Sequence, residues 1–255
     1  MASFRDQGLV LRHYNLGEAD RIIVLFTRAH GLLRCVAKGV RRTRSRFGAR
    51  LEPFTLIDVQ IYPGRNLNTI TEAVTVETFN ARIVADYERY TAAASVLEAV
   101  ERLLGEEEQP NPQLFDLTVG VMGALSYGRR SPQQMVDTYL LRAMAEAGWA
   151  PELDKCAVCG AEGPHQAFHP AAGGVVGVKH RPPGSATPMA GVLEYLRSLR
   201  DARWDRADSI AGDKKLGRRV QEEAHQLIVS HLQWHTERKI TAFDLAAEAE
   251  RGHWR

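Results

Sequence analysis

The sequence predicts an α+β protein in which a small five-stranded β-barrel precedes a helical domain. Residues 8–79 hold five short strand-like runs with no helix between them. From about residue 86 the apolar residues recur at helical spacing instead. A third stretch, at about 150–190, is rich in Gly and Pro and contains a Cys pair. We therefore expect a barrel domain at 1–80 and a helical domain at 81–255, the latter interrupted by a zinc-knuckle-like insertion at about 150–190.

The five expected strands are rich in Val, Ile and Leu and are separated by turn residues. In the fourth, Ile57, Val59 and Ile61 alternate with polar side chains, which is typical of a strand with one buried face. Five strands in about seventy residues indicate a small closed barrel. The strands are Val10–Tyr14, Arg21–Thr27, Leu32–Ala37, Leu56–Tyr62 and Leu67–Val76.

The expected helices are recognised by apolar spacing and by their end signals. Ser131 is a candidate N-cap, with Pro132 in the first turn and Gln134 completing a capping box, and Gly148 is the matching C-cap. The other predicted helices are Asp86–Leu104, Gln113–Leu125, Val192–Arg200 and Leu216–Arg238.

Charge is distributed unevenly along the chain. The chain carries +2 overall, but residues 1–50 carry +8 and the remainder therefore carries −6. This polarity predicts a nucleic-acid-binding face on the barrel domain and a different role for the rest.

A basic loop, defined as residues 38–50, concentrates that charge between the third and fourth strands. It contains one Lys and five Arg and no acid. Guanidinium groups match a phosphate backbone well, so the functional interpretation is phosphate contact, with Phe47 either stacking on a base or packing inward. The alternative is a solvated charged turn. The candidate phosphate ligands are Lys38, Arg41, Arg42, Arg44 and Arg46.

The Cys pair, Cys156 and Cys159, forms a CxxCG motif, the spacing that lets two thiolates reach one zinc ion. His180 can supply a third ligand. Gly177 stands where a fourth is expected, and His169 or His165 is the available replacement. Three interpretations stay open: a structural zinc site, a decayed knuckle held by packing, or a redox pair.

Other features argue against catalysis, secretion and membrane insertion. Phosphate loops, dinucleotide-binding glycine motifs and nucleophile elbows are absent from the sequence. His231 and His235 share a helical face but lack the zincin Glu, so surface or packing roles are expected, and Cys35 is expected to be a buried apolar residue. Three cysteines and no apolar signal segment favour the cytoplasm. The alternatives to a DNA-binding protein are a metal-dependent enzyme acting on nucleic acid and a protein adaptor with no DNA role.

The order of these features resembles the bacterial RecO family of recombination mediators over essentially the whole chain. The similarity begins with GLVLRHYNLGEADRIIVLFTRAHGLLRCVAKGVRR and continues through LEPFTLIDVQIYPGRNLNTITEAV. A helical region, the CxxCG motif, a Gly-Gly pair and a final helix follow in the family's order.

The resemblance implies an OB-fold that binds single- and double-stranded DNA, and a helical domain with a zinc-finger-like insertion. It adds Arg12 and Arg21 to the candidate DNA ligands, and it matches Cys156, Cys159 and His180 to zinc-ligand positions, whereas Gly177 departs from the expected Cys. It further implies a non-enzymatic mediator associated with the nucleoid. Such a protein anneals complementary strands and, with RecR, helps to load RecA onto DNA coated by single-strand-binding protein, whose C-terminal tail is an expected partner.

Overall fold

The computed structural model describes residues 2–105, 109–128 and 130–237. They form two compact units, one running to Pro132 and the other beginning at Gln133, and we describe each by itself. Residue 80 marks the change from strand to helix, as the sequence indicates, and the first three helices form one compact unit with the barrel.

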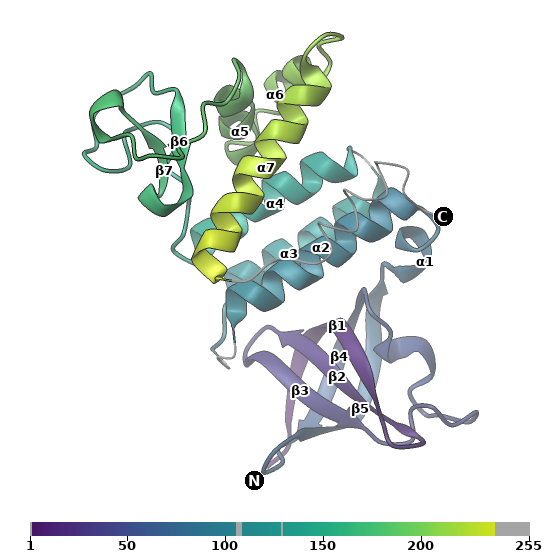
Figure 1. The fold of residues 1–255 in the computed structure, drawn as a ribbon. Helices are drawn as coiled ribbons and strands as arrows, with labels where there is room; N and C mark the ends of the chain where they lie inside the picture. Colours follow the sequence, from purple (N-terminus) through teal and green to yellow (C-terminus); the bar gives the residue numbers. More distant parts are fainter. Residues whose placement is uncertain (1, 106–108, 129, 238–255) are drawn as a thin grey trace. The chain divides into compact units, whose positions relative to one another are not determined.

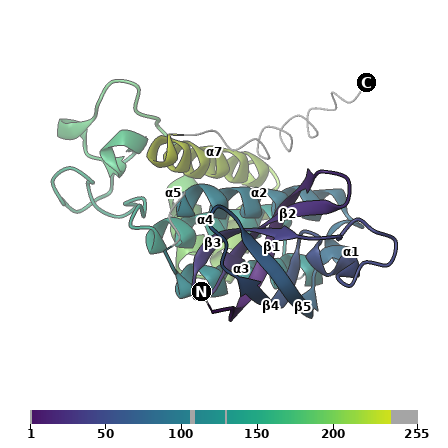
Figure 2. The ribbon, with the colours of Figure 1, turned by 90° about the horizontal axis from the view of Figure 1, so that it is seen from below.

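The N-terminal strands close into a barrel in the order β1-β2-β3-β5-β4, which confirms the predicted architecture (Figures 1 and 2). β1 starts earlier than its apolar run because Phe4 already pairs with Ile61 of β4. All neighbouring pairs are antiparallel except β3 and β5, which pair only at Cys35–Asn68 and Val36–Thr69. The strands are β1 (Phe4–Leu16), β2 (Asp20–Thr27), β3 (Gly31–Ala37), β4 (Thr55–Tyr62) and β5 (Asn68–Thr78).

The barrel core consists of the inward-facing side chains of all five strands, including Ile23, Cys35 and Ile57, each fully buried. Cys35 is thus a packing residue, as expected. The alternation of the fourth strand is confirmed, since Ile57, Val59 and Ile61 are buried. The basic loop ends in a short 3₁₀ helix, η1 (Gly48–Leu51), whose Leu51 belongs to the barrel core.

Three helices complete the first unit: α1 (Asn80–Ile83), α2 (Tyr87–Leu104) and α3 (Pro112–Tyr127). α2 begins where Asp86 accepts a hydrogen bond from the Arg89 amide, and α3 begins where Asn111 accepts one from Leu114. The two long helices lie side by side (Figure 1). α1 was not predicted, because a single helical turn has no apolar periodicity to detect.

The second unit contains four further helices and a small two-stranded sheet. Its core holds the fully buried Tyr139 of α4, Tyr195 of α5 and Leu232 of α7. α6 was missed by the sequence analysis, since eight residues give too few turns for a clear pattern. The predicted end of the last helix, Arg238, lies outside the described residues. The helices are α4 (Pro132–Glu146), α5 (Val192–Arg200), α6 (Trp204–Ala211) and α7 (Gly217–Thr236), and the strands are β6 (Ala167–His169) and β7 (Gly174–Val176).

Across the described residues, no helix is both long enough and apolar enough to span a lipid bilayer.

Candidate nucleic-acid interface and metal site

The basic loop is anchored to the barrel by apolar side chains that point inward. Val40, Phe47 and Leu51 are at most 8% exposed and belong to the barrel core. Backbone contacts add to this, because the Gly39 amide donates to Asp20 Oδ1 at 2.7 Å. The loop is therefore a fixed part of the barrel surface. The sequence left open whether Phe47 stacks on a base or packs inward. Phe47 is 1% exposed, so it packs inward and is not accessible to a base.

The five candidate phosphate ligands all remain exposed on this anchored loop. Arg46 stacks on the Phe47 ring with its guanidinium carbon 4.8 Å from the ring centroid, and Arg41 donates to the Gly17 carbonyl at 3.2 Å. Among the described residues, no carboxylate pairs with any of the five. Their positive charge is therefore available to an external anion. The five are Lys38, Arg41, Arg42, Arg44 and Arg46.

Arg50 also belongs to this cationic surface, although the sequence analysis did not include it among the candidate ligands. It is exposed, and its Nη1 donates to the Arg46 carbonyl at 2.7 Å. The signal was present, since Arg50 closes the same acid-free run. Its position beside Arg46 depends on η1, which the sequence did not predict.

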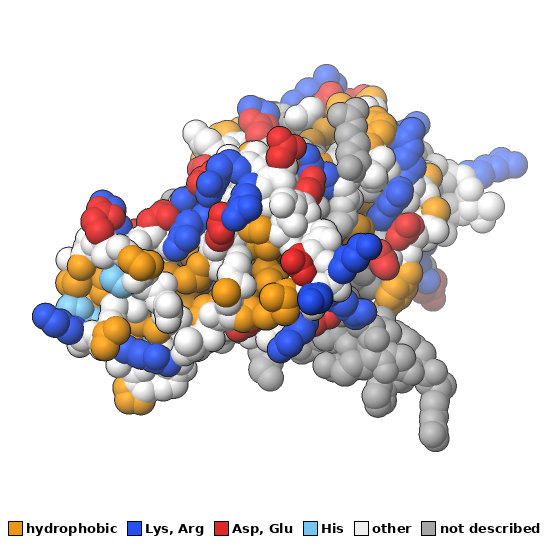
Figure 3. Space-filling view, turned by 90° about the horizontal axis from the view of Figure 1, so that it is seen from above, with side chains coloured by type: hydrophobic (Ala, Val, Ile, Leu, Met, Phe, Trp, Pro, Cys, Tyr) orange, Lys and Arg blue, Asp and Glu red, His pale blue; other side chains and the backbone are white. Residues whose placement is uncertain are grey.

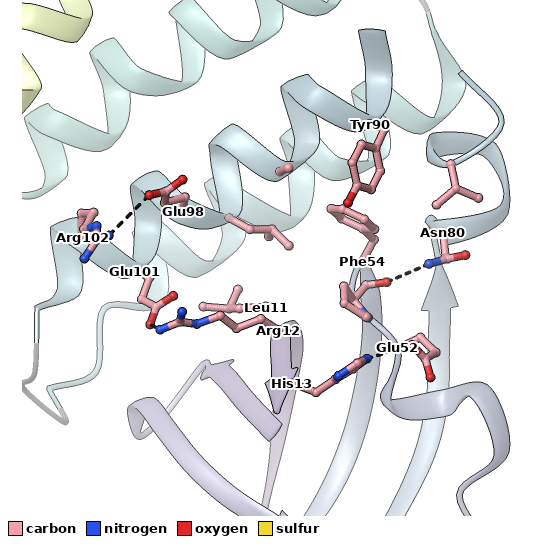
Figure 4. Close-up of a pocket in the computed structure, with 14 residues that line it drawn as sticks. Leu11, Arg12, His13, Glu52, Phe54, Asn80, Tyr90, Glu98, Glu101 and Arg102 are labelled. Atoms are coloured by element: carbon pink, nitrogen blue, oxygen red, sulfur yellow. Dashed lines mark hydrogen bonds and ion pairs between the residues drawn. The ribbon is translucent and has the colours of Figure 1, made fainter. Parts of the chain in front are cut away.

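Arg12 and Arg21 lie in a different electrostatic setting, because each is paired with a carboxylate of this protein. Arg12 pairs with Glu101 of α2 (Figure 4). Arg21 pairs with Glu52 at 2.8 Å. Partial burial raises the pKa of Glu52, but hydrogen bonds from Arg21 and His13 outweigh it and leave that pKa lowered. Glu52 is thus held as a carboxylate, and Arg21 already has its anion.

Arg12, Glu101 and Glu52 from these pairs line a cavity of about 590 Å³ between the barrel and α2 (Figure 4). Arg102 pairs with Glu98 at 3.4 Å on its far wall, and Phe54 contacts Tyr90 edge to face. Cations and carboxylates alternate around this cavity. Its electrostatics are therefore unlike those of the basic loop and do not favour a polyanion.

In the second unit, Cys156, Cys159 and His180 come together as the sequence analysis expected. One ligand atom from each lies within 4.8 Å of the others, and Cys156 Sγ is 3.8 Å from His180 Nδ1. Tetrahedral zinc with thiolate and imidazole ligands spaces its ligand atoms by about 3.3–3.8 Å. The Cys156–His180 distance lies at the upper end of this range, and Cys159 Sγ lies within 4.8 Å of both atoms, so the set is close to the spacing that a zinc ion needs.

The Cys156 thiol lies in a hydrogen-bonded environment that favours its ionised form. The Gly177 amide lies 3.3 Å from Cys156 Sγ, and together with the Cys159 and Val158 amides it lowers the pKa of Cys156 to about 6, against the opposing effect of burial. Backbone amides directed at a thiolate stabilise the form that binds metal. Gly174 allows β7 to approach the backbone of Glu152 closely. Its φ is +141°, and a Cβ at this position would lie 2.2 Å from the Glu152 carbonyl oxygen.

His165 lies where a side chain at position 177 would be. A Cβ built on Gly177 would be 3.4 Å from His165 Nδ1 and 3.8 Å from Cys156 Sγ. His165 Nε2 donates to the Ala161 carbonyl at 2.8 Å when it carries the proton, which leaves Nδ1 with its lone pair. Neither His165 nor His169 belongs to the cluster of three ligands, and Nδ1 of His169 on β6 is buried with no hydrogen-bond partner in the described structure.

Of the two roles expected for His231 and His235, surface or packing, the structure shows packing, with His235 stacked on the Trp149 ring. His231 is 1% exposed, lies edge to face with Phe168, and contacts the Trp149 carbonyl through Nε2 at 3.0 Å. Burial lowers its pKa to about 4, which outweighs the opposing effect of that hydrogen bond. His231 is therefore neutral at physiological pH.

Cationic and anionic side chains are interspersed on the face shown in Figure 3. In the second unit the ion pairs include Arg197–Asp154 at 3.0 Å and Arg206–Glu194 at 2.7 Å. These arginines already have carboxylate partners, in contrast to the cations of the basic loop.

A closed five-stranded barrel of OB type, carrying an anchored cationic loop and followed by a helical unit, defines a class of nucleic-acid-binding proteins. Comparison with known families agrees with this class and narrows it. Residues 1–79 match the family described as Recombination protein O N terminal, and residues 84–242 match Recombination protein O C terminal. The chain belongs to the RecO family, which places it in DNA recombination and repair.

Proposed function

We propose that this protein is a non-catalytic recombination mediator that binds DNA through the basic loop and anneals complementary strands. The observation that carries the proposal is the set of exposed cations, Lys38 to Arg46, that no described carboxylate neutralises. Each is held on a rigid barrel surface, so binding a phosphate costs little additional ordering of the loop.

Charge neutralisation is the physical basis proposed for annealing. Two complementary strands repel each other along their phosphates, and a cationic surface that holds one strand lowers this repulsion. The interaction requires positioning and neutralisation only. Phe47 is buried, and no other aromatic side chain lies within the basic loop to read a base. We therefore expect little sequence preference.

Reversal of charge tests the DNA-binding role directly. The variant Arg41→Glu, Arg42→Glu, Arg44→Glu is expected to lose binding to a labelled oligonucleotide at low salt and to lose strand annealing. A matched control is Lys214→Glu, Lys215→Glu, Arg219→Glu, which makes the same charge change at exposed positions of the second unit. Undiminished binding by the loop variant, with a normal circular dichroism spectrum, would refute the proposal.

The partners proposed for this activity are RecR, RecA indirectly, and the C-terminal tail of single-strand-binding protein. Support comes from family membership, and we expect association with the nucleoid on the same ground. A RecA loading assay on DNA coated by single-strand-binding protein tests this role. Loading should require both this protein and RecR, and unchanged loading when either is omitted would contradict it.

We further propose that Cys156, Cys159, His180 and His165 hold a structural zinc ion. Zinc would supply a crosslink between the CxxC turn and the segment after β7, with no catalytic step. The support is the spacing of three ligand atoms and the placement of His165 Nδ1 beside Gly177.

Metal analysis of purified variants tests the ligand set. The wild type is expected to carry about one zinc per chain, and the double variant Cys156→Ala, Cys159→Ala is expected to carry none. His165→Ala should lose zinc readily to a mild chelator, whereas the matched control His169→Ala should retain it. If zinc retention depends on His169 and not on His165, then His169 is the fourth ligand and this part of the proposal is wrong. If the wild type carries no zinc, the insertion is a decayed knuckle.

A further inference from the structure

Two neighbouring cavities on the barrel share one wall, made by Arg46, Phe47 and Arg50. The larger, of about 510 Å³, is also lined by Thr55, Thr75 and Thr78. The smaller, of about 290 Å³, is lined on its other side by residues 71–74 of β5. Together they follow β5 from Thr71 to Thr78, and we call this depression the β5 groove.

The β5 groove exists because one edge of β5 is left without a partner strand. β4 pairs along β5 from Thr69 to Thr78, but β3 pairs with it only at Asn68 and Thr69. Among the described residues, no strand covers the second edge from Ile70 onward. An open edge of this kind presents backbone polar groups to whatever lies in the groove.

The cationic wall of the groove is ordered before any ligand arrives. Arg46 is stacked on Phe47, and Arg50 is tied to the Arg46 carbonyl through one of its N–H groups. The guanidinium forks keep further donors, and no described carboxylate lies within ion-pair distance of either. The one acid lining the groove, Glu72, already pairs with Arg5 at 2.9 Å.

The opposite wall offers hydroxyls and few apolar side chains. Thr75 and Thr78 are exposed on β5, and hydroxyls of this kind are common phosphate ligands, whereas the Thr71 hydroxyl donates to the Gln60 carbonyl at 3.1 Å. Cations on one wall and hydroxyls with backbone groups on the other complement a sugar–phosphate chain. An apolar peptide would find little to bury beyond Val74.

We propose that the β5 groove holds the backbone of single-stranded DNA. This inference rests on the proposed function, and it assigns the binding of single strands to one part of the DNA-binding surface. A duplex is a stiff rod that can touch the tips of Arg41, Arg42 and Arg44 but does not enter a depression between a strand and a loop. A single strand is flexible enough to lie along β5. The loop tips therefore serve both forms of DNA, whereas Arg46 and Arg50 inside the groove favour the single strand.

Binding of oligo-dT and of a hairpin duplex, measured by fluorescence anisotropy over a range of salt concentrations, tests this assignment. Arg50→Ala is expected to weaken oligo-dT binding roughly tenfold and to reduce the salt slope by about 0.7, with duplex binding unchanged. Thr75→Glu, an exposed substitution on the opposite wall, should act in the same direction. Arg219→Ala, an exposed cation of the second unit that lines neither cavity, is the matched control.

The possible outcomes separate this inference from the proposed function. Equal losses on single and double strands would overturn the groove assignment. Unchanged binding by both groove variants, with loss in the Arg41, Arg42, Arg44 charge-reversal variant, would also overturn it and leave the DNA-binding proposal standing. If no variant loses DNA binding, both the groove assignment and the proposed DNA-binding role of the basic loop are wrong. If a labelled oligo-glutamate peptide binds in an Arg50-dependent manner while oligo-dT binding is unaffected, the groove serves an acidic protein segment instead.

Discussion

The buried imidazole of His231 links the stability of the second unit to pH. Its pKa is about 4 in the folded protein and about 6.5 when unfolded. Between these two pKa values the unfolded chain binds more protons than the folded protein does. The free energy of unfolding therefore rises as pH increases through this window and falls as pH decreases. His231 alone is expected to remove about 2 kcal/mol of stability between pH 7.5 and pH 5. Denaturant titrations of wild type and His231→Gln check this, since the Gln variant should lose that part of the pH dependence. Identical pH profiles would contradict it.

At the metal site, one residue accounts for the departure from the expected ligand pattern. Gly177 has φ −73°, a value that any L-residue adopts, so Gly177→Cys is expected to fold. Its thiolate would take the place of His165 beside Cys156 and should bind zinc more tightly than wild type. In the Gly177→Cys background, His165→Ala should then no longer release the metal. Competition with a chromogenic chelator measures this, and continued dependence on His165 would show that it has another role.

At the scale of the element, the basic loop combines an apolar anchor with a cationic surface. Phe47 is a fully buried member of the barrel core, whereas its neighbour Arg46 is exposed. Phe47→Ala is expected to cost about 3–5 kcal/mol of stability through the cavity it leaves. Arg46→Ala should leave stability nearly unchanged and weaken DNA binding. Urea titrations and oligonucleotide binding, measured on both variants, separate the roles, and a stable Phe47→Ala protein would show that the loop does not depend on this anchor.

At the scale of the whole molecule, the uneven distribution of charge predicts how binding responds to salt. If all five candidate cations contact phosphates of a single strand, the slope of log affinity against log salt should approach about −3.5. Replacing Arg41, Arg42 and Arg44 by Gln should reduce its magnitude by about 2. The measurement is a salt titration of oligo-dT binding, with Lys214→Gln, Lys215→Gln, Arg219→Gln as control. A slope near zero in the wild type would contradict a binding mode based on phosphate contacts.

The barrel and the long helices could be predicted from the sequence because their signals are local. Strand alternation at Ile57, Val59 and Ile61, and the end signals at Pro132 and Gly148 on either side of α4, depend on neighbours in the chain. The one-turn helix α1 is too short to show such periodicity, and in α6 the apolar pattern is limited to Trp204, Ala207 and Ile210. Their formation depends on packing against other elements, which a local pattern does not encode.

The sequence alone determined the fold class, the basic loop with its five candidate cations, and the Cys–His set that comes together near zinc geometry. Side-chain type and spacing along the chain carry this information. Only the tertiary structure decided that Phe47 packs inward, that Arg12 and Arg21 are neutralised by Glu101 and Glu52, and that His165 lies beside Gly177. The physical reason is that burial and charge pairing depend on residues distant in sequence, which meet only when the barrel and the loops have closed.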